Sequence, residues 1–301
     1  MTITILGPTA TGKTRIAAML AKHIGGEIIS ADSRQVYCGM DIGTGKDLAD
    51  YTIDGISIPY HLIDIVKPGI EYNVFQYQQL AHQAIRDIEE RGKQVVICGG
   101  SGMYIEALLK GYKLFPVPDN PSLRAELEKQ TDEQLTELLA SFKALHNHTD
   151  TCERPRLLRA IEIEVYYREH PELWESCRAV PSVVFGLRGD RDLIRSRITR
   201  RLRDRLETGM VEEVRNLIAG GVSQQQLIRY GLEYKFLTLY LQGQMDYDTM
   251  FERLKIAIHQ FSKRQMTWFR KMERDGFNIH WMDVEWPEED KLSFILRTCN
   301  L

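Results

Sequence analysis

A glycine-rich segment near the N-terminus has the residue types and the spacing of a phosphate-binding loop, or P-loop. The residues Gly7-Pro8-Thr9-Ala10-Thr11-Gly12-Lys13-Thr14 fit the pattern G-x-x-x-x-G-K-[ST], which is typical of nucleotide- and ATP-binding proteins. Such a loop turns backbone N–H groups toward phosphate oxygens, while Lys13 adds a positive charge and the Thr14 hydroxyl can bind Mg²⁺. The pattern predicts a polyphosphate ligand. It leaves a kinase, an NTPase and a diphosphate-releasing transferase open.

A carboxylate follows the second predicted strand. Asp32 lies just past the carboxyl end of residues 27–30, within the polar segment Ser30–Lys46. In open α/β sheets, this edge carries the ligands. A carboxylate there can hold Mg²⁺ or accept a proton from a nucleophile, and it can also simply cap the following turn. The residues alone leave these roles open.

The elements that must position these segments are strands that alternate with helices. This alternation predicts an α/β fold with a parallel sheet of the P-loop NTPase-like class. The predicted strands are residues 2–6, 27–30, 58–63, 94–98, 182–187 and 277–282. The predicted helices of the same region are residues 13–24, 73–91, 102–110, 190–208, 209–219, 225–241 and 246–274.

The middle of the chain has a different pattern. From the proline-rich segment 116–121 to Val180-Pro181, only helical patterns occur, at residues 122–129, 132–145 and 154–168. We therefore expect a P-loop catalytic core made of residues 1–115 and 182–301. A helical insert of residues 116–181 would interrupt it.

The composition is ordinary for a globular enzyme, with 43% hydrophobic and 27% charged residues. The formal net charge is -3, so a nucleic-acid partner would have to be held by local basic patches. We find no signal-peptide pattern and no apolar stretch of the roughly 18–20 residues that a membrane span needs. We expect a cytoplasmic protein without membrane contact, with free thiols at its scattered cysteines Cys38, Cys98, Cys152, Cys177 and Cys299.

Five segments together resemble the tRNA dimethylallyltransferase family, also called tRNA isopentenyltransferases or IPP transferases. They occur in that family's order and cover nearly the whole chain: Gly7–Thr14, Ser30–Lys46, Pro59–Asp64, Gly99–Tyr104 and Lys263–Arg270. The resemblance implies transfer of a dimethylallyl group from dimethylallyl diphosphate to N6 of the adenosine next to the anticodon in tRNA. Diphosphate would be released.

The resemblance also implies roles for single residues. Asp32 would hydrogen-bond N6 and take its proton. Lys13, the loop N–H groups, Thr14 and Mg²⁺, the one cofactor expected, would hold the diphosphate. The family's diphosphate-binding arginine aligns with Arg201, although a helix this rich in arginine can also be a solvated basic face. Ser101 stands where the family usually has Thr and keeps a hydroxyl near the diphosphate or Asp32.

A surface for the anticodon stem-loop of tRNA is implied from several segments. Basic and planar groups suit such a loop, because its splayed bases can stack. The expected residues are Asp32, Ser33, Arg34, Gln35, Gly102, Arg124, Arg156, Arg159, Tyr234, Lys235, Lys263, Arg264, Gln265 and Arg270. On the last of these helices, Trp268 and Phe269 can equally be core residues, because Ile256, Phe261 and Trp268 share helical spacing.

The chain departs from the family pattern in three places. Glu233 stands where the family commonly has Gly, and His259 stands where an Arg is expected. Cys152-Glu153-Arg154 replaces the usual Asn-Asp-Pro of the insert. These positions lie in regions that the family uses around tRNA, so they bear on the choice of tRNA more than on the chemistry.

Three other functions remain in view. A nucleoside or nucleotide kinase would share the P-loop, with the arginines of residues 188–205 acting as a lid over ATP. A prenyltransferase acting on free adenine nucleotide would have no use for the insert or for Lys263–Arg270. An RNA-binding protein with an inactive P-loop would have no reason to keep Lys13, Thr14 and Asp32. We expect a monomer that uses dimethylallyl diphosphate and tRNA.

Overall fold

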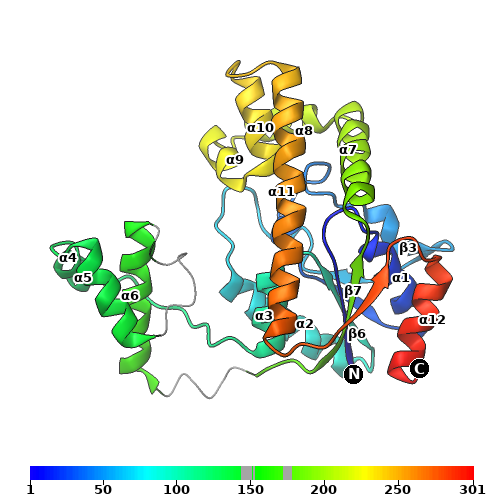
Figure 1. The fold of residues 1–301 in the computed structure, drawn as a ribbon, viewed down its shortest axis with the longest axis horizontal. Helices are drawn as coiled ribbons and strands as arrows, with labels where there is room; N and C mark the ends of the chain where they lie inside the picture. The colour runs from blue at the N-terminus through cyan, green and yellow to red at the C-terminus, as the bar shows by residue number, and fades with distance from the viewer. Residues whose placement is uncertain (144–150, 152, 172–177) are drawn as a thin grey trace. The chain divides into compact units, whose positions relative to one another are not determined.

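The computed structural model describes residues 1–143, 151, 153–171 and 178–301. These residues form two compact units, one made of residues 1–111 and 179–301 and the other of residues 112–178 (Figure 1). Cys152 and Cys177 lie outside the described residues, as does the end of the helix predicted at 132–145. The other three cysteines, Cys38, Cys98 and Cys299, are free thiols, as expected.

The larger unit is built on a six-stranded sheet in which every neighbouring pair of strands is parallel. The strand order is β5-β2-β6-β1-β7-β8, so β1, which leads into the P-loop, lies in the middle. This confirms the predicted α/β fold class. The bounds are β1 Thr2–Leu6, β2 Glu27–Ser30, β5 Tyr60–His61, β6 Val95–Gly99, β7 Ser182–Arg188 and β8 Ile279–Asp283.

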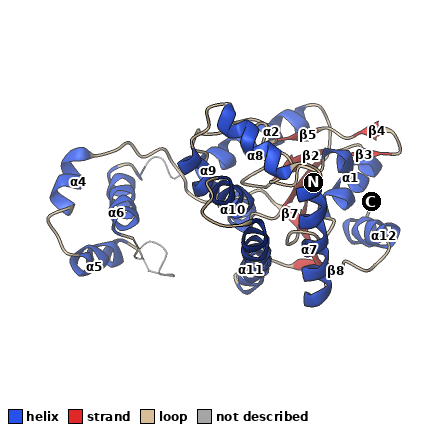
Figure 2. Cartoon of the chain, turned by 90° about the horizontal axis from the view of Figure 1, so that it is seen from above, coloured by secondary structure: helices blue, strands red, loops and turns tan. Residues whose placement is uncertain are grey.

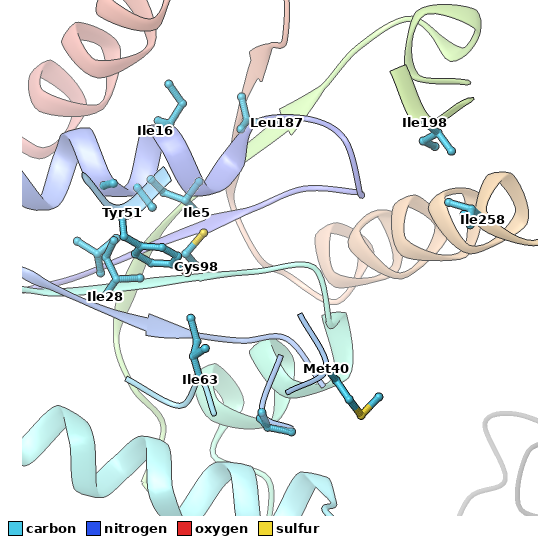
Figure 3. Packing of buried hydrophobic residues seen from close by; sticks show 14 of the residues in the cluster. Ile5, Ile16, Ile28, Met40, Tyr51, Ile63, Cys98, Leu187, Ile198 and Ile258 are labelled. Atoms are coloured by element: carbon cyan, nitrogen blue, oxygen red, sulfur yellow. The ribbon is translucent and has the colours of Figure 1, made fainter. Parts of the chain in front are cut away.

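Two hydrophobic clusters cover the two faces of the sheet, because neighbouring residues of a strand point to opposite faces. Ile5 and Ile28 belong to one cluster, which Figure 3 shows with Ile16 of α1, and Leu6 and Ile29 belong to the other. The helices of this unit are α1 Lys13–Ile24, α2 Val74–Glu90, α3 Gly102–Lys110, α7 Arg191–Glu207, α8 Met210–Ala219, α9 Gln224–Tyr230, α10 Leu232–Leu241, α11 Tyr247–Arg274 and α12 Glu288–Cys299.

One predicted helix was wrong. The stretch 225–241 forms two helices, α9 and α10, because the chain turns at Gly231 and at Leu232, the first residue of α10, whose φ angles of +75° and +41° interrupt a continuous helix. The predicted strand 58–63 is reduced to the two residues of β5. The structure adds elements that were not predicted, namely the short helix η1 Leu48–Tyr51, the hairpin β3 Thr52–Ile53 with β4 Ile56–Ser57, and α12.

The described residues of the smaller unit form three helices, α4 Pro121–Leu127, α5 Asp132–Phe142 and α6 Arg154–Glu169 (Figure 1). Asn120 and Thr131 cap the first two helices with their side chains. The helices bury a core of their own, to which Leu135, Leu139 and Ile161 contribute fully buried side chains. No helix among the described residues of either unit is long and apolar enough to cross a membrane.

Candidate active site

The P-loop connects the central strand β1 to α1, as its sequence pattern requires. Gly12 adopts a φ of +79°, and Ala10 adopts a φ of +65°, which a residue with a Cβ atom rarely takes. Thr11 Oγ1 donates to Pro8 O at 2.9 Å across the loop. Lys13 Nζ donates to the same carbonyl at 3.4 Å, so the ammonium lies within the curve of the loop.

Gln265 of α11 connects the P-loop to the loop after β6 through the two ends of its amide group. Its Oε1 accepts from Thr9 N at 2.9 Å, and its Nε2 donates to Gly100 O at 2.9 Å. The side chain is buried. The expected contact of Gln265 with tRNA stays a prediction; in the structure its amide joins two loops at the carboxyl ends of β1 and β6. The sequence offered no signal for these contacts, because they join residues that lie 256 and 165 positions apart in the chain.

A cavity of about 400 Å³ opens in front of the P-loop, and we call it the P-loop cavity. It brings together the four residues that were predicted to be catalytic, Lys13, Thr14, Asp32 and Arg201. Arg201 Nη2 donates to Thr9 Oγ1, which fixes the guanidinium beside the loop. Burial and the neighbouring Arg205 lower the pKa of Arg201 to about 10, and burial also lowers the pKa of Lys13. The cavity therefore places two poorly solvated cations, Lys13 and Arg201, among the carboxylates of Asp32, Asp47, Asp50 and Asp204, which also line it.

Asp32 lies on the loop after β2 and lines the P-loop cavity. Its Oδ1 accepts from Arg34 N at 2.9 Å and from Gln35 N at 3.4 Å, so this oxygen caps the turn. Within the described part of the chain, Oδ2 accepts no hydrogen bond. Ser101 Oγ accepts from Ser33 N at 3.0 Å and thereby anchors the loop that carries Asp32. Capping the turn and accepting a proton are compatible roles for Asp32, because one oxygen caps the turn and the other is available.

A second cavity, of about 500 Å³, adjoins the first and shares Thr9, Lys13, Asp32, Thr44 and Arg201 with it. We call it the aromatic cavity because the side chains of Tyr230, Tyr234, Phe236 and Phe261 line it.

Three cations of the aromatic cavity lie over its rings. The Arg34 guanidinium is 5.6 Å from the Tyr230 ring centre, Lys235 Nζ is 5.8 Å from that of Phe236, and the Arg264 guanidinium is 5.9 Å from that of Phe261. Flat faces next to cations suit a planar nucleobase joined to phosphates.

Sequence reasoning missed most of the aromatic lining. Tyr230, Phe236 and Phe261 were not predicted as site residues, and Phe261 was grouped with the core by helical spacing. That grouping was wrong, because Ile256 is 51% exposed. The buried face of α11 consists instead of Met250, Leu254, Ile258, Ser262, Gln265, Phe269 and Met272, so Phe269 takes the core position, one of the two roles left open for it. Trp268 is partly buried, and its Nε1 donates to Glu106 Oε2 at 2.8 Å.

Three further residues of the expected tRNA set, Tyr234, Gly102 and Gln35, have internal contacts. The Tyr234 hydroxyl is in hydrogen-bond contact with Glu213 Oε1 at 2.8 Å, and the Glu213 carboxylate also accepts from the backbone N–H groups of residues 41–43. Gly102 is buried beneath Trp268, where an added Cβ would lie 2.4 Å from the indole ring. Both residues hold the walls of the site in place. Gln35 does the same by donating to Gly45 O at 3.1 Å.

Glu233, the departure from the family's glycine, lines the aromatic cavity. Burial raises the pKa of its carboxyl, and the nearby guanidinium groups of Arg205 and Arg201 oppose this rise. The second departure, His259, faces α7 with Nε2 at 3.3 Å from Arg195 O. Cys152 of the third lies outside the described residues.

The three arginines of the smaller unit that were expected to contact tRNA divide into two kinds. Arg124 donates to Glu162 through Nε at 2.7 Å and Nη2 at 2.8 Å, and Arg159 donates to the same carboxylate through Nη1 at 3.0 Å. Burial alone would raise the pKa of Glu162, but these hydrogen bonds lower it. Arg156 is more exposed and lies 3.3 Å from Glu153 Oε2. Of the three, Arg156 is the most available to a partner.

The comparisons with known proteins point in one direction. A family model described as IPP transferase matches residues 35–272. The chain is 56% identical to tRNA dimethylallyltransferase 1 of Parabacteroides distasonis, over 99% of this chain and 97% of that protein.

Solved structures give the same result. The fold is similar to the crystal structure of the full-length tRNA isopentenylpyrophosphate transferase from Bacillus halodurans, with a TM-score of 0.72, 31% identity and coverage of 99% of this chain and 95% of that one. It is similar to the tRNA delta(2)-isopentenylpyrophosphate transferase from Staphylococcus epidermidis, with a TM-score of 0.70, 31% identity and coverage of 99% and 98%.

Proposed function

The chain belongs to the IPP transferase family, and we propose how its two adjoining cavities divide the work of an enzyme that transfers a dimethylallyl group to an adenosine in tRNA. The P-loop cavity would hold the diphosphate of dimethylallyl diphosphate, and the aromatic cavity would hold the adenine. The observation that carries this proposal is that Lys13 and Asp32 line both cavities. A leaving group and a nucleophile would meet there.

The P-loop cavity is suited to diphosphate as a leaving group. When the bond between the allylic carbon and the diphosphate oxygen breaks, negative charge develops on the diphosphate. Lys13, the N–H groups of the loop and Arg201 would stabilise that charge in a setting with little water. A preorganised donor of this kind contributes roughly 3–4 kcal/mol to lowering a barrier. Thr9 and Gln265 would keep these donors in place before the substrate arrives.

The donors of this cavity could hold a magnesium ion together with the substrate. Thr14 supplies a hydroxyl, and no group of three or more His, Cys, Asp or Glu side chains within the described ranges is arranged to hold a metal. Mg²⁺ keeps several waters and binds through few protein ligands and substrate phosphates, so this sparse set suits it. Bound with the diphosphate, Mg²⁺ would supply further positive charge.

Asp32 would act as the base. The exocyclic N6 of adenine attacks the allylic carbon, a C–N bond forms as the C–O bond breaks, and the N6 proton passes to the carboxylate. Oδ1 is held by two backbone N–H groups, which leaves Oδ2 to accept the proton. Because Ser101 anchors the same loop, the base would keep its orientation between turnovers.

The aromatic cavity would receive the adenosine next to the anticodon. A base in an anticodon loop must leave its stack to reach a cavity of this depth. Stacking on an aromatic side chain is worth roughly 1–3 kcal/mol per base, which would offset part of the cost of unstacking. The side chains of Arg34, Lys235 and Arg264 would form ion pairs with the phosphates on either side of the base.

The remaining expectations complete the proposal. Residues 116–181 would form an insert that contacts tRNA, with Arg156 as its most available cation. The enzyme would act as a monomer in the cytoplasm.

The test compares two substrate pairs with the same preparation. With dimethylallyl diphosphate and bulk tRNA we expect a dimethylallyl group on tRNA and one diphosphate released for each transfer. With ATP and nucleosides we expect no phosphorylated nucleoside. Transfer to free adenine nucleotide as efficient as transfer to tRNA would contradict the proposed substrate, and phosphorylation of a nucleoside would restore the kinase reading.

A further inference from the structure

One carboxyl of the aromatic cavity has no role in the reaction described above. Glu233 lines that cavity as the second residue of α10, directly after the turn at Gly231 and Leu232. Glycine is common in the family at this position, so the fold itself does not require a carboxyl there. Within the described residues, Glu233 forms no ion pair. A partly buried acid without such a partner needs an explanation.

Glu233 also borders a small hollow beside Arg201. This hollow, of about 10 Å³, has three polar side chains in its lining, those of Glu233, Arg201 and Arg205, and is otherwise lined by Ile198, Leu202, Met210 and Ile258. The helix that supplies Ile258, α11, packs against both α7 and α10 (Figures 1 and 2), which brings the start of α10 to the arginines of α7. A space of this size holds about one water, and apolar surroundings strengthen the attraction between opposite charges.

The two arginines of the hollow differ in their partners. Arg205 Nη2 donates to both carboxylate oxygens of Asp47, at 3.2 and 3.0 Å, so the charge of Arg205 is already balanced. Arg201 donates to a hydroxyl of the P-loop and, within the described part of the chain, forms no ion pair. Burial lowers the pKa of Arg201, and Glu233 is among the carboxylates that oppose this effect. Glu233 therefore faces a guanidinium that has no bonded carboxylate of its own.

We propose that Glu233 is the counter-ion of Arg201 in the free enzyme, and that Arg201 exchanges it for the diphosphate when that ligand binds. This inference rests on the proposed function, which assigns Arg201 to the diphosphate. Glu233 would be a positioning residue that acts through Arg201 and does not touch the diphosphate. Because Arg201 lines both cavities, a residue of the aromatic cavity can in this way affect the ligand of the P-loop cavity.

The exchange changes the protonation of Glu233. Burial raises the pKa of its carboxyl, while the guanidinium groups of Arg205 and Arg201 oppose the rise. Once diphosphate takes up the charge of Arg201, the carboxylate loses that stabilisation and faces an anion, so it takes up a proton from solvent. The proton returns to solvent when diphosphate leaves. Glu233 would thus weaken diphosphate binding and favour product release, without placing a charge beside the transition state.

Other titratable groups face Glu233 as well. Arg34 of the loop after β2 is near enough to oppose the rise in the pKa of Glu233. The remaining charged or titratable side chains of the aromatic cavity are Lys13, Asp32, Lys235, Arg264, Tyr230 and Tyr234, and Glu213 of α8 contacts Tyr234. A variant of Glu233 alone retains all of these groups. A difference in pH dependence between that variant and the wild type therefore reports on Glu233.

The experiment compares the wild type with Glu233→Gln, which keeps the size of the side chain and removes its charge. The affinity for inorganic diphosphate is measured by calorimetry without tRNA, from about pH 5.5 to about pH 8.5. Inhibition by added diphosphate and the single-turnover rate at saturating dimethylallyl diphosphate and tRNA are measured with the same proteins. The matched control is Asp204→Asn, which removes an exposed carboxylate that lines the P-loop cavity.

The expected result is tighter binding of diphosphate. At the upper end of the pH range, Glu233→Gln should bind it roughly tenfold more tightly than the wild type, because a poorly solvated negative charge near the ligand is gone. The difference should shrink as the pH falls, since Glu233 of the wild type then becomes neutral. Inhibition by diphosphate should strengthen by the same factor, with a single-turnover rate within about twofold of the wild type.

The control separates this effect from a general loss of negative charge. Asp204→Asn should change diphosphate affinity by less than about threefold, because solvent screens an exposed charge. Damage to the fold would weaken binding, so a purely structural role of Glu233 cannot produce the expected gain. Glu233→Gly, which removes the side chain altogether, should give the same gain as Glu233→Gln.

Three results would overturn the inference. Equal diphosphate affinity of Glu233→Gln and the wild type across the pH range would mean that Glu233 does not balance Arg201. Weaker binding by the variant would mean that the carboxylate holds Arg201 in its binding position. A raised KM for tRNA with unchanged diphosphate affinity would assign Glu233 to the nucleotide. The diphosphate titrations use no tRNA, so failure of the proposed function would be recognised separately, by the wild type not prenylating tRNA.

Discussion

The P-loop cavity and the aromatic cavity share Lys13 and Asp32 but are assembled in different ways. The groups proposed to bind phosphate in the first come mainly from one continuous segment, residues 7–14, with Arg201 added from α7. The second takes its walls from the loop after β2, from α10 and from α11, which lie far apart in the chain. A phosphate group needs donors at fixed short spacing, which a loop can supply. A planar base needs facing surfaces, which only tertiary packing can supply.

This comparison predicts that changes in one cavity spare the ligand of the other. The largest effect is expected for Lys13→Ala. The loss of a preorganised cation should slow single-turnover transfer by roughly a hundredfold to a thousandfold and weaken diphosphate binding. The affinity for tRNA, measured by titration, should remain within about twofold of the wild type, because Lys13 would bind the diphosphate and not a phosphate of the tRNA. Loss of one phosphate contact with the tRNA would lower the affinity by more than that. A comparable loss of tRNA affinity would break the division between the cavities.

A change in the aromatic cavity should have the opposite signature. Phe261→Leu keeps an apolar side chain but removes the ring, so KM for tRNA should rise by roughly fivefold to tenfold through lost stacking. Diphosphate affinity should not change.

The matched control for that variant is Phe251→Leu. Phe251 is also a half-buried phenylalanine of α11 with two cations near its ring, but it does not line the cavity. Equal effects of the two variants would show that helix packing, and not base stacking, explains the loss.

The smallest effects are expected in the smaller unit, where two arginines should behave differently. Arg124→Gln removes two hydrogen bonds to the buried Glu162 and should lower the free energy of unfolding by on the order of 1–2 kcal/mol, measured by thermal or denaturant unfolding. Arg156→Gln should leave stability unchanged and reduce the salt slope of tRNA binding by about 0.7–0.9. If Arg156→Gln instead lowered stability and Arg124→Gln reduced the salt slope, Arg156 would have the structural role and Arg124 the RNA-binding role.

The same contrast explains how much could be predicted from the sequence. The parallel sheet, the P-loop and Asp32 at a strand end follow from local patterns of hydrophobic and glycine residues. Gln265, Tyr230 and Phe236 could not be found in that way, because their roles depend on contacts between segments that are distant in the chain. The break between α9 and α10 was missed for a related reason: a single glycine inside a helical pattern does not reveal that the next residue, Leu232, also adopts a positive φ.

Helical spacing does not identify the buried face of α11, for a physical reason. A helix with apolar residues on several flanks has no single face that periodicity can select. Ile256 and Phe261 line two different hollows, while the buried face includes the polar Ser262 and Gln265. Polar residues on a buried face mislead a pattern based on hydrophobicity, and Gln265 lies there because it holds the P-loop.

The central claim is that Asp32 serves the nucleophile while the P-loop serves the leaving group. The direct measurement is the single-turnover rate of Asp32→Asn at saturating dimethylallyl diphosphate and tRNA, with the affinity for dimethylallyl diphosphate measured in parallel. The control is Asp204→Asn, an exposed carboxylate that also lines the P-loop cavity. The account predicts a rate lower by roughly a hundredfold or more for Asp32→Asn, as expected for loss of a general base, with diphosphate affinity and the control near wild type. A wild-type single-turnover rate in Asp32→Asn would contradict it.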